Sequence, residues 1–203
     1  MSRVELAMLG GSLRTGSVSA RVLLACAELA DGYGARASIL TAQQLALPLY
    51  EPDFRPRLAA AHKLLSVLRR ANGVIVVTPT YHGGVSGLLK NALDYVEDLA
   101  GDTPAYLGGR AAGTAAVGWS ERGAATAVAE LRNTMMCLRG WVTPMAVTVN
   151  AADISMGDDA VRSDQRVMRR LDILVSQVLD FTQANSAVGR TSPELTLNSS
   201  HRR

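Results

Sequence analysis

The chain of 203 residues has few aromatic residues and almost no lysine. Aromatic residues make up 4% of the chain, and every basic residue is arginine except Lys63 and Lys90. The net charge is only +3 at pH 7, and basic and acidic residues alternate along the sequence. A nucleic-acid-binding domain concentrates its basic residues on one face or in one tail, so we expect no nucleic acid partner.

Cysteine is also scarce, and the two cysteines, Cys26 and Cys137, lie far apart. Neither has a CxxC partner or a nearby histidine, so the usual spacing of metal ligands is absent and we expect no bound metal. We interpret both as small buried side chains, which fits a reducing compartment.

Long apolar runs are missing as well. No stretch of about 18 apolar residues occurs, so we expect no membrane-spanning segment and no membrane partner. The start of the chain lacks the apolar stretch of a secretory signal peptide. We therefore expect a cytoplasmic protein.

The composition favours one folded domain. Hydrophobic residues make up 48% of the chain and charged residues 19%, which is typical of a globular protein. We expect residues 1–184 to form a single domain. Residues 185–203 are polar and end in His-Arg-Arg, so we expect a disordered tail there.

Strand and helix patterns alternate along the chain. Short apolar runs predict five strands: Val4–Leu9, Ala37–Leu40, Gly73–Thr78, Ala111–Val117 and Met145–Val149. Segments with helical spacing follow them: Ser17–Tyr33, Arg57–Asn72, Leu88–Leu99, Gly123–Leu138 and Asp158–Gln183. Such alternation predicts an α/β fold with a doubly wound parallel sheet of order 2-1-3-4-5 and helices on both faces. Ligands of such sheets bind at the carboxyl ends of the strands, where the winding reverses.

The loop Gly10–Ser19 follows the first expected strand and opens the first helix. A helix N-terminus stabilises a phosphate through free N–H groups and partial positive charge. Arg14 adds a cationic fork suited to phosphate oxygens. Short hydroxyl donors are also present: Ser12, Thr15, Ser17 and Ser19. Neither GxxxxGK[ST] nor GxGxxG is found. The alternative is a plain turn with Ser17 as the helix N-cap.

A second glycine-rich loop, Pro79–Gly87, follows the third expected strand. We expect Pro79 to end that strand. Gly83 and Gly84 permit positive φ and leave bare backbone that a flat ring could approach. Tyr81 and His82 could flank such a ring. The alternative for His82 is an exposed loop histidine, and no carboxylate is evident that would orient it as a base.

Four segments resemble the NAD(P)H-dependent FMN reductase family of flavodoxin-like proteins. They are GSLRTGS (11–17), LPLYEPD (47–53), PTYHGGVSGLLKNALDYV (79–96) and LRNTMMCLRGWVTP (131–144). Their order and spacing agree with the family's over roughly residues 3–150. The resemblance implies a flavodoxin-like fold and FMN as the cofactor. It also implies a homodimer, often a dimer of dimers.

The resemblance further implies which residues contact FMN. Those around the phosphate are Ser12, Arg14, Ser17, Val18 and Ser19. Those along the isoalloxazine ring are Pro79, Thr80, Tyr81, His82, Gly83 and Gly84. Those on the ring's other side are Trp119, Ser120 and Gly123. The sequence departs from the family at Thr80, where glutamate is usual, at His82, where asparagine is usual, and in the loop 118–123. For Trp119, packing under its loop is an equal alternative.

A flavoenzyme of this kind transfers a hydride from NADPH or NADH to flavin N5 and passes the electrons to an acceptor such as free flavin or a quinone. The cofactor performs this chemistry, so we assign no catalytic residue. FMN is either a fixed group or a diffusible substrate that is handed to a flavin-dependent monooxygenase. The alternative from another class is a flavodoxin-type electron carrier, but flavodoxins are acidic and this chain has a pI of about 9.1.

Two further questions stay open at this point. Arg14, Arg122 and the Arg55/Arg57 pair could each bind the 2′-phosphate of NADPH, and nothing chooses among them. We expect the helices Leu88–Leu99 and Gly123–Leu138 to form the dimer interface. The candidate contacts there are Tyr95, Met135 and Met136, and their alternative is a place in the chain's own core.

Overall fold

The computed structural model describes residues 3–53, 56–154, 157 and 159–187. The described part contains a six-stranded sheet, in which five parallel strands run in the order β2-β1-β3-β5-β6. The strands are β1 (Glu5–Gly10), β2 (Arg36–Leu40), β3 (Gly73–Tyr81), β4 (Gly84–Val85), β5 (Ala111–Gly118) and β6 (Trp141–Asn150). The α/β fold and the 2-1-3-4-5 order of the parallel strands are thereby confirmed.

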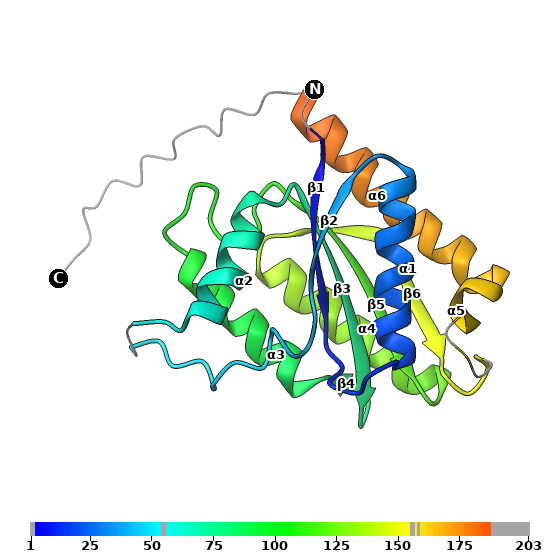
Figure 1. The fold of residues 1–203 in the computed structure, drawn as a ribbon. Helices are drawn as coiled ribbons and strands as arrows, with labels where there is room; N and C mark the ends of the chain where they lie inside the picture. The colour runs from blue at the N-terminus through cyan, green and yellow to red at the C-terminus, as the bar shows by residue number, and fades with distance from the viewer. Residues whose placement is uncertain (1–2, 54–55, 155–156, 158, 188–203) are drawn as a thin grey trace.

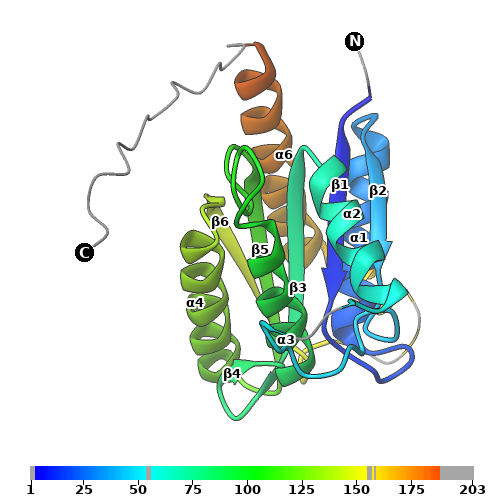
Figure 2. The ribbon, with the colours of Figure 1, turned by 90° about the vertical axis from the view of Figure 1, so that its left-hand side faces the viewer.

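Helices cover both faces of the sheet (Figure 1). On one face lie α1 (Val18–Gly32), α5 (Ala160–Ser163) and α6 (Gln165–Ala187). On the other lie α2 (Ala59–Arg70), α3 (Gly87–Asp94), the 3-10 helix η1 (Tyr95–Leu99) and α4 (Glu121–Cys137). Figure 1 shows the sheet nearly edge-on between these two layers, and Figure 2 shows its strands side by side, seen from the face that α2 and α3 cover.

The central strands are apolar on both faces because both faces are covered. In β1, Leu6 and Met8 pack with α1 and α6, whereas Ala7 and Leu9 pack with α2 and α3. All four side chains are fully buried. The protein therefore has two separate hydrophobic cores, one on each face of the sheet. Together they hold the sheet in place below the loops that leave its carboxyl edge.

The sequence predicted that the third strand ends at Pro79, but the strand continues beyond this residue. β3 continues to Tyr81 and turns back through the short antiparallel strand β4, which the prediction missed. Pro79 has no N–H to donate at the edge of the ladder. The Gly11 carbonyl, which lies one residue beyond the last paired position of β1, accepts a hydrogen bond from the Ser86 hydroxyl instead.

The C-terminal helix differs from the single helix expected over Asp158–Gln183. A break at Asp164 separates α5 from α6, and the Asp164 carboxylate accepts hydrogen bonds from the N–H groups of Arg166 and Val167. An aspartate competes well for such free N–H groups, and this favours the start of a new helix. α6 runs to Ala187, so residues 185–187 of the expected tail are helical; residues 188–203 lie outside the described part.

The last strand, β6, begins at Trp141, four residues before the expected Met145. Its first part was not recognised because the pairing of β6 with β5 is irregular there. The pairing of β5 with β6 jumps from Ala112↔Val142 to Thr114↔Ala146. Pro144 lies within this shift, where a missing N–H costs no ladder bond. The alternating exposure of this edge strand hides it from a search for apolar runs.

Two of the expected interface residues, Tyr95 and Met135, are buried within the chain, so the alternative of a place in the core is the correct one. Met136 is exposed. None of the helices in the described residues combines the length and the hydrophobicity that crossing a membrane requires.

Candidate functional site

Three loops leave the same edge of the sheet, at the carboxyl ends of β1, β3 and β5 (Figure 1, lower end). They are the β1–α1 loop (residues 11–17), the hairpin Pro79–Val85 and the β5–α4 loop (residues 119–120). β1 and β3 are neighbours, and β2 lies on the other side of β1, so the winding of the sheet reverses here. This is the position at which doubly wound folds bind their ligands.

The β1–α1 loop ends in a capped helix. Ser17 is the N-cap of α1, and its Oγ accepts a hydrogen bond of 3.2 Å from the Ala20 N–H. The Ser17 and Ser19 hydroxyls lie 3.2 Å apart, and Ser19 is buried. Gly16 has a φ of +63°, in the left-handed region, which turns the chain into the helix. The N-cap expected at Ser17 is thus present.

The remaining polar side chains of this loop have no partner within the described residues. No hydrogen bond or ion pair there involves the side chains of Ser12, Arg14 or Thr15, and Arg14 and Thr15 are exposed. Hydroxyls and a guanidinium that are held at a helix N-terminus match the donors that a phosphate requires. The residues present therefore fit the phosphate of FMN.

Arg21 holds this loop in place, and the sequence analysis missed that role. One guanidinium nitrogen donates to the Gly16 carbonyl at 2.7 Å, and another donates to the Gly157 carbonyl, beyond β6. The Arg21 guanidinium, in the first turn of α1, thus donates hydrogen bonds to two backbone carbonyls. Within the helical pattern, nothing distinguishes Arg21 from an ordinary surface arginine.

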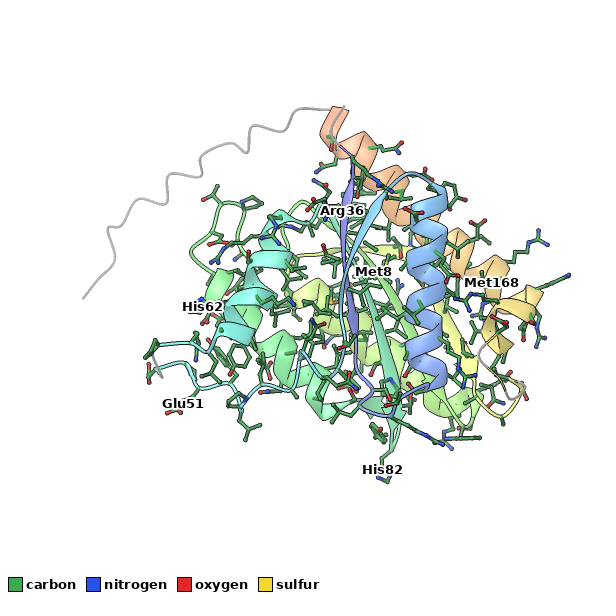
Figure 3. All side chains as sticks on the ribbon, in the orientation of Figure 1. Met8, Arg36, Glu51, His62, His82 and Met168 are labelled. Atoms are coloured by element: carbon green, nitrogen blue, oxygen red, sulfur yellow. The ribbon has the colours of Figure 1, made fainter. Side chains whose placement is uncertain are left out.

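The hairpin turns through His82 and Gly83, which have φ values of 53° and 84°. A two-residue turn with both φ angles positive favours asparagine at the first position and glycine at the second. This explains why His82 can stand where the family usually has asparagine, since histidine is among the residues that tolerate this conformation. His82 lies at the tip of the hairpin and points away from the molecule (Figure 3).

The hairpin glycines face helix α4. A Cβ on Gly84 would lie 3.1 Å from Glu130 Oε2, and a Cβ on Gly83 would lie 3.1 Å from Thr126 Oγ1. Glu130 Oε2 also accepts a 2.9 Å hydrogen bond from the Val85 N–H. Both glycines thus lie close to side-chain ends of α4, and their place along a flat ring stays a prediction. Glu130 was not found from the sequence because it lies 45 residues away.

The β5–α4 loop lies against the hairpin. Ser120 is the N-cap of α4, and its Oγ accepts a 3.2 Å hydrogen bond from the Gly123 N–H. Thr80 Oγ1 donates to the Gly123 carbonyl at 3.4 Å, so the residue that replaces the usual glutamate joins the two loops. Trp119 is 75% exposed, so it does not pack under its own loop, and Tyr81 is 58% exposed.

The Leu47–Asp53 segment, which carries another family motif, is bound to α3 and η1. Asn91 accepts from the Tyr50 N–H at 2.8 Å and donates to the carbonyls of Leu47 and Pro48. The Tyr95 hydroxyl donates to the Pro48 carbonyl at 3.1 Å. This segment therefore serves as scaffold.

A buried ion pair reinforces the same region. Arg57 donates to both carboxylate oxygens of Asp98, at 2.7 and 2.9 Å, and its guanidinium lies 4.6 Å from the centre of the Tyr50 ring. The hydrogen bond to Asp98 raises the pKa of Arg57. Arg57 is thus buried and paired with Asp98, which disfavours it among the candidate ligands of the 2′-phosphate. Arg55 lies outside the described residues.

Comparisons with known proteins agree with this geometry. A segment of 51 residues, 25% of this chain, is 47% identical to an NADPH azoreductase from Bacillus sp. (strain OY1-2), and it spans only 29% of that protein. A longer match of 151 residues, 73% of this chain, is 28% identical to an NADH-dependent FMN reductase from Pseudomonas putida and spans 77% of it.

Among solved structures, the chain is similar to a flavoenzyme NAD(P)H:acceptor oxidoreductase from Paracoccus denitrificans. The TM-score is 0.72 at 22% identity, and the alignment covers 90% of this chain and 98% of that one. This likeness confirms the flavodoxin-like fold. The model of the family described as NADPH-dependent FMN reductase matches residues 4–153. Since this match covers most of the chain, the protein belongs to the NADPH-dependent FMN reductase family.

Proposed function

We propose that this protein is an NAD(P)H-dependent flavin oxidoreductase that binds FMN at the carboxyl edge of its sheet. The observation that carries the proposal is the set of unpartnered donors Ser12, Arg14 and Thr15 at the N-terminus of α1. They lie one strand away from the hairpin that follows β3. Family membership supports FMN and a nicotinamide nucleotide as the ligands.

In this proposal the β1–α1 loop holds the phosphate. Arg14 neutralises its charge and Ser12 donates to its oxygens, while the capped first turn, Ser17–Ser19, directs the free N–H groups of α1 at it. The residues along the ring are Pro79, Thr80, Tyr81, His82, Gly83 and Gly84. When bound, FMN supplies a ring that accepts a hydride at N5 and gives up the electrons to a second substrate.

The β5–α4 loop lies where it can border the other side of the ring, with Trp119, Ser120 and Gly123. Trp119 and Tyr81 are large, exposed aromatic side chains on opposite loops, and such side chains stack readily on flat rings. We infer that they shape the space in which the nicotinamide and then the acceptor stack. No proton transfer by a side chain is required for the hydride step.

The names of the relatives point to different acceptors, an azo compound in one case and free FMN in the other. We propose that a small flat acceptor, such as a flavin, quinone or azo compound, takes the place of the nicotinamide. If free FMN is the acceptor, a flavin-dependent monooxygenase is the expected recipient. Of the candidate ligands for the 2′-phosphate of NADPH, Arg14 and Arg122 remain among the described residues, and both are exposed.

The oligomeric state and the location belong to the same proposal. A homodimer or a dimer of dimers would cover the exposed aromatic side chains at this edge, and Met136 on α4 is the remaining candidate contact. Of the two cysteines, Cys26 is buried as expected, whereas Cys137 is exposed, so the expectation of two buried cysteines is wrong for Cys137. Both are free thiols, which supports a cytoplasmic location.

Anaerobic titration tests the activity. The protein is loaded with FMN, and NADPH or NADH is added while the absorbance of the flavin is followed. We expect the flavin to be bleached at a rate that saturates with the nucleotide. Bound FMN that stays yellow with both nucleotides would favour the electron-carrier alternative, and a protein that binds no FMN would contradict the proposal as a whole.

A further inference from the structure

Ser86 stands at the junction of the two loops that carry the proposed cofactor site. It is 2% exposed and follows the hairpin directly, as the N-cap of α3. Its Oγ accepts a 3.3 Å hydrogen bond from the Leu89 N–H and donates a 3.0 Å hydrogen bond to the carbonyl of Gly11. Gly11 is the first residue of the β1–α1 loop, 75 residues away in the sequence.

The contact between these two residues is unusually close. A Cβ on Gly11 would lie 2.6 Å from Ser86 Oγ and 3.0 Å from Pro79 Cδ, so only glycine fits without rearrangement. The missing N–H of Pro79 leaves the Gly11 carbonyl without its ladder donor, and the Ser86 hydroxyl supplies the replacement. Ser86 thus requires glycine at position 11, and Pro79 leaves free the carbonyl to which Ser86 donates.

Ser86 is itself held firmly. Its N–H donates to Thr78 Oγ1 at 3.0 Å, and Thr78 is fully buried at the end of the straight part of β3. Thr78 Oγ1 in turn donates to the Pro79 carbonyl at 2.8 Å. The start of the β1–α1 loop and both ends of the hairpin are therefore connected through two buried hydroxyls, those of Ser86 and Thr78.

We propose that Ser86 is a positioning residue that sets the spacing between the phosphate-binding loop and the ring-binding hairpin. This inference rests on the proposed function. FMN spans both loops, so its affinity depends on their spacing. Riboflavin lacks the phosphate, so it depends on the loops around the ring, the hairpin and the β5–α4 loop, and not on the β1–α1 loop. Preorganised spacing lowers the cost of binding only for the ligand that contacts both loops.

The test measures dissociation constants for FMN and for riboflavin by quenching of flavin fluorescence. In Ser86→Ala, we expect the preference for FMN over riboflavin to fall about three- to tenfold, which is the usual worth of one hydrogen bond. The affinity for riboflavin should stay near that of the wild type. Thr78→Val keeps its volume but removes the acceptor of the Ser86 N–H, and it should lower the preference in the same direction by less.

The matched control is Thr182→Val. Thr182 is also buried and its hydroxyl also donates to a backbone carbonyl, that of Val178, but it lies on α6 beside Asn72 and Gly73, at the opposite edge of the sheet. This variant should lose a similar amount of stability and keep the full preference for FMN. Thermal unfolding of each variant shows whether the fold is intact.

The results separate the two proposals. If the wild type prefers FMN and both Ser86→Ala and Thr78→Val keep that preference, the role of Ser86 is refuted while the proposed function stands. An equal loss of affinity for FMN and riboflavin would also refute it, because that is the result expected of general destabilisation. If the wild type binds neither flavin, the proposed function itself fails.

Discussion

The β1–α1 loop and the Leu47–Asp53 segment both resemble motifs of one family, yet their polar groups are used in opposite ways. The backbone and side chains of Leu47–Asp53 are tied to α3 and η1 through Asn91, Tyr95 and Arg57. In the β1–α1 loop, the side chains of Ser12, Arg14 and Thr15 have no partner within the described residues.

Under the proposed function, this difference separates scaffold from site. Polar groups that are satisfied within the chain stabilise the fold, whereas exposed groups without a partner in the described residues are available to a ligand. A motif in the sequence does not distinguish the two, because both kinds of residue are typical of the family. The comparison predicts that substitutions in the first region change stability and substitutions in the second change ligand affinity.

The largest expected effect is on stability. Asp98→Ala removes the partner of the buried Arg57 guanidinium and leaves its charge uncompensated. We expect the free energy of unfolding to fall by about 3–5 kcal/mol, as for other buried pairs broken on one side. Unfolding in urea measures this. The control is Asp102→Ala, which breaks the partly exposed pair with Arg69 and should lower stability far less. Equal losses for the two variants would contradict the scaffold role.

The next effect is on affinity. Arg14→Ala removes an exposed guanidinium that has no partner among the described residues, so stability should change by less than about 0.5 kcal/mol. We expect the dissociation constant for FMN to rise about 10- to 100-fold, because hydrogen bonds to charged groups are the strong ones. Titration with FMN measures it. Arg36→Ala, an exposed arginine at the amino end of β2, is the control and should bind FMN normally. If Arg14→Ala binds FMN with normal affinity, the proposed difference between the β1–α1 loop and the Leu47–Asp53 segment is contradicted.

A smaller effect concerns the second substrate. Trp119→Ala should raise KM for the nicotinamide nucleotide or the acceptor about two- to tenfold, the usual worth of an aromatic pair, with stability unchanged. Steady-state kinetics measures this. Trp141→Ala tests another exposed tryptophan, at the amino end of β6, where it stacks on Phe181 at 5.3 Å between ring centres. That variant should leave KM unchanged, and the same rise in both would rule out a specific role for Trp119.

The smallest expected effect uses Cys26 as a probe. Burial raises the pKa of its thiol to about 12, so the native protein should not react with a thiol reagent at about pH 8. In a Cys137→Ser background, labelling of Cys26 then reports opening of the core. We expect Asp98→Ala to accelerate this labelling and Arg14→Ala to leave it unchanged. Acceleration by Arg14→Ala would mean that the loop belongs to the scaffold.

Much of the fold could be predicted from the sequence because its information is local. Buried parallel strands are apolar throughout, as Gly73–Thr78 is, and the N-cap at Ser17 is a short-range signal. The order of the strands follows from the alternation of strand and helix. The β6 strand was only partly found because its exposed edge and Pro144 disturb the pattern.

The parts that could not be predicted depend on contacts distant in the sequence. Nothing near Gly11 indicates that a hydroxyl 75 residues away fills the space in which its side chain would stand. Likewise, nothing in the sequence distinguishes Arg57 from the other arginines, because only the structure shows its pairing with Asp98. The loops after β1, β3 and β5 were predicted correctly, but only the three-dimensional structure shows which of their polar side chains have partners within the described residues.

The affinity of the wild-type protein for FMN compared with riboflavin tests the central claim most directly. If the β1–α1 loop holds the flavin phosphate, several hydrogen bonds from charged and neutral donors favour FMN, and we expect it to bind more than about 100-fold more tightly. Titration of both flavins under the same conditions measures this ratio. Equal dissociation constants for FMN and riboflavin would contradict the account.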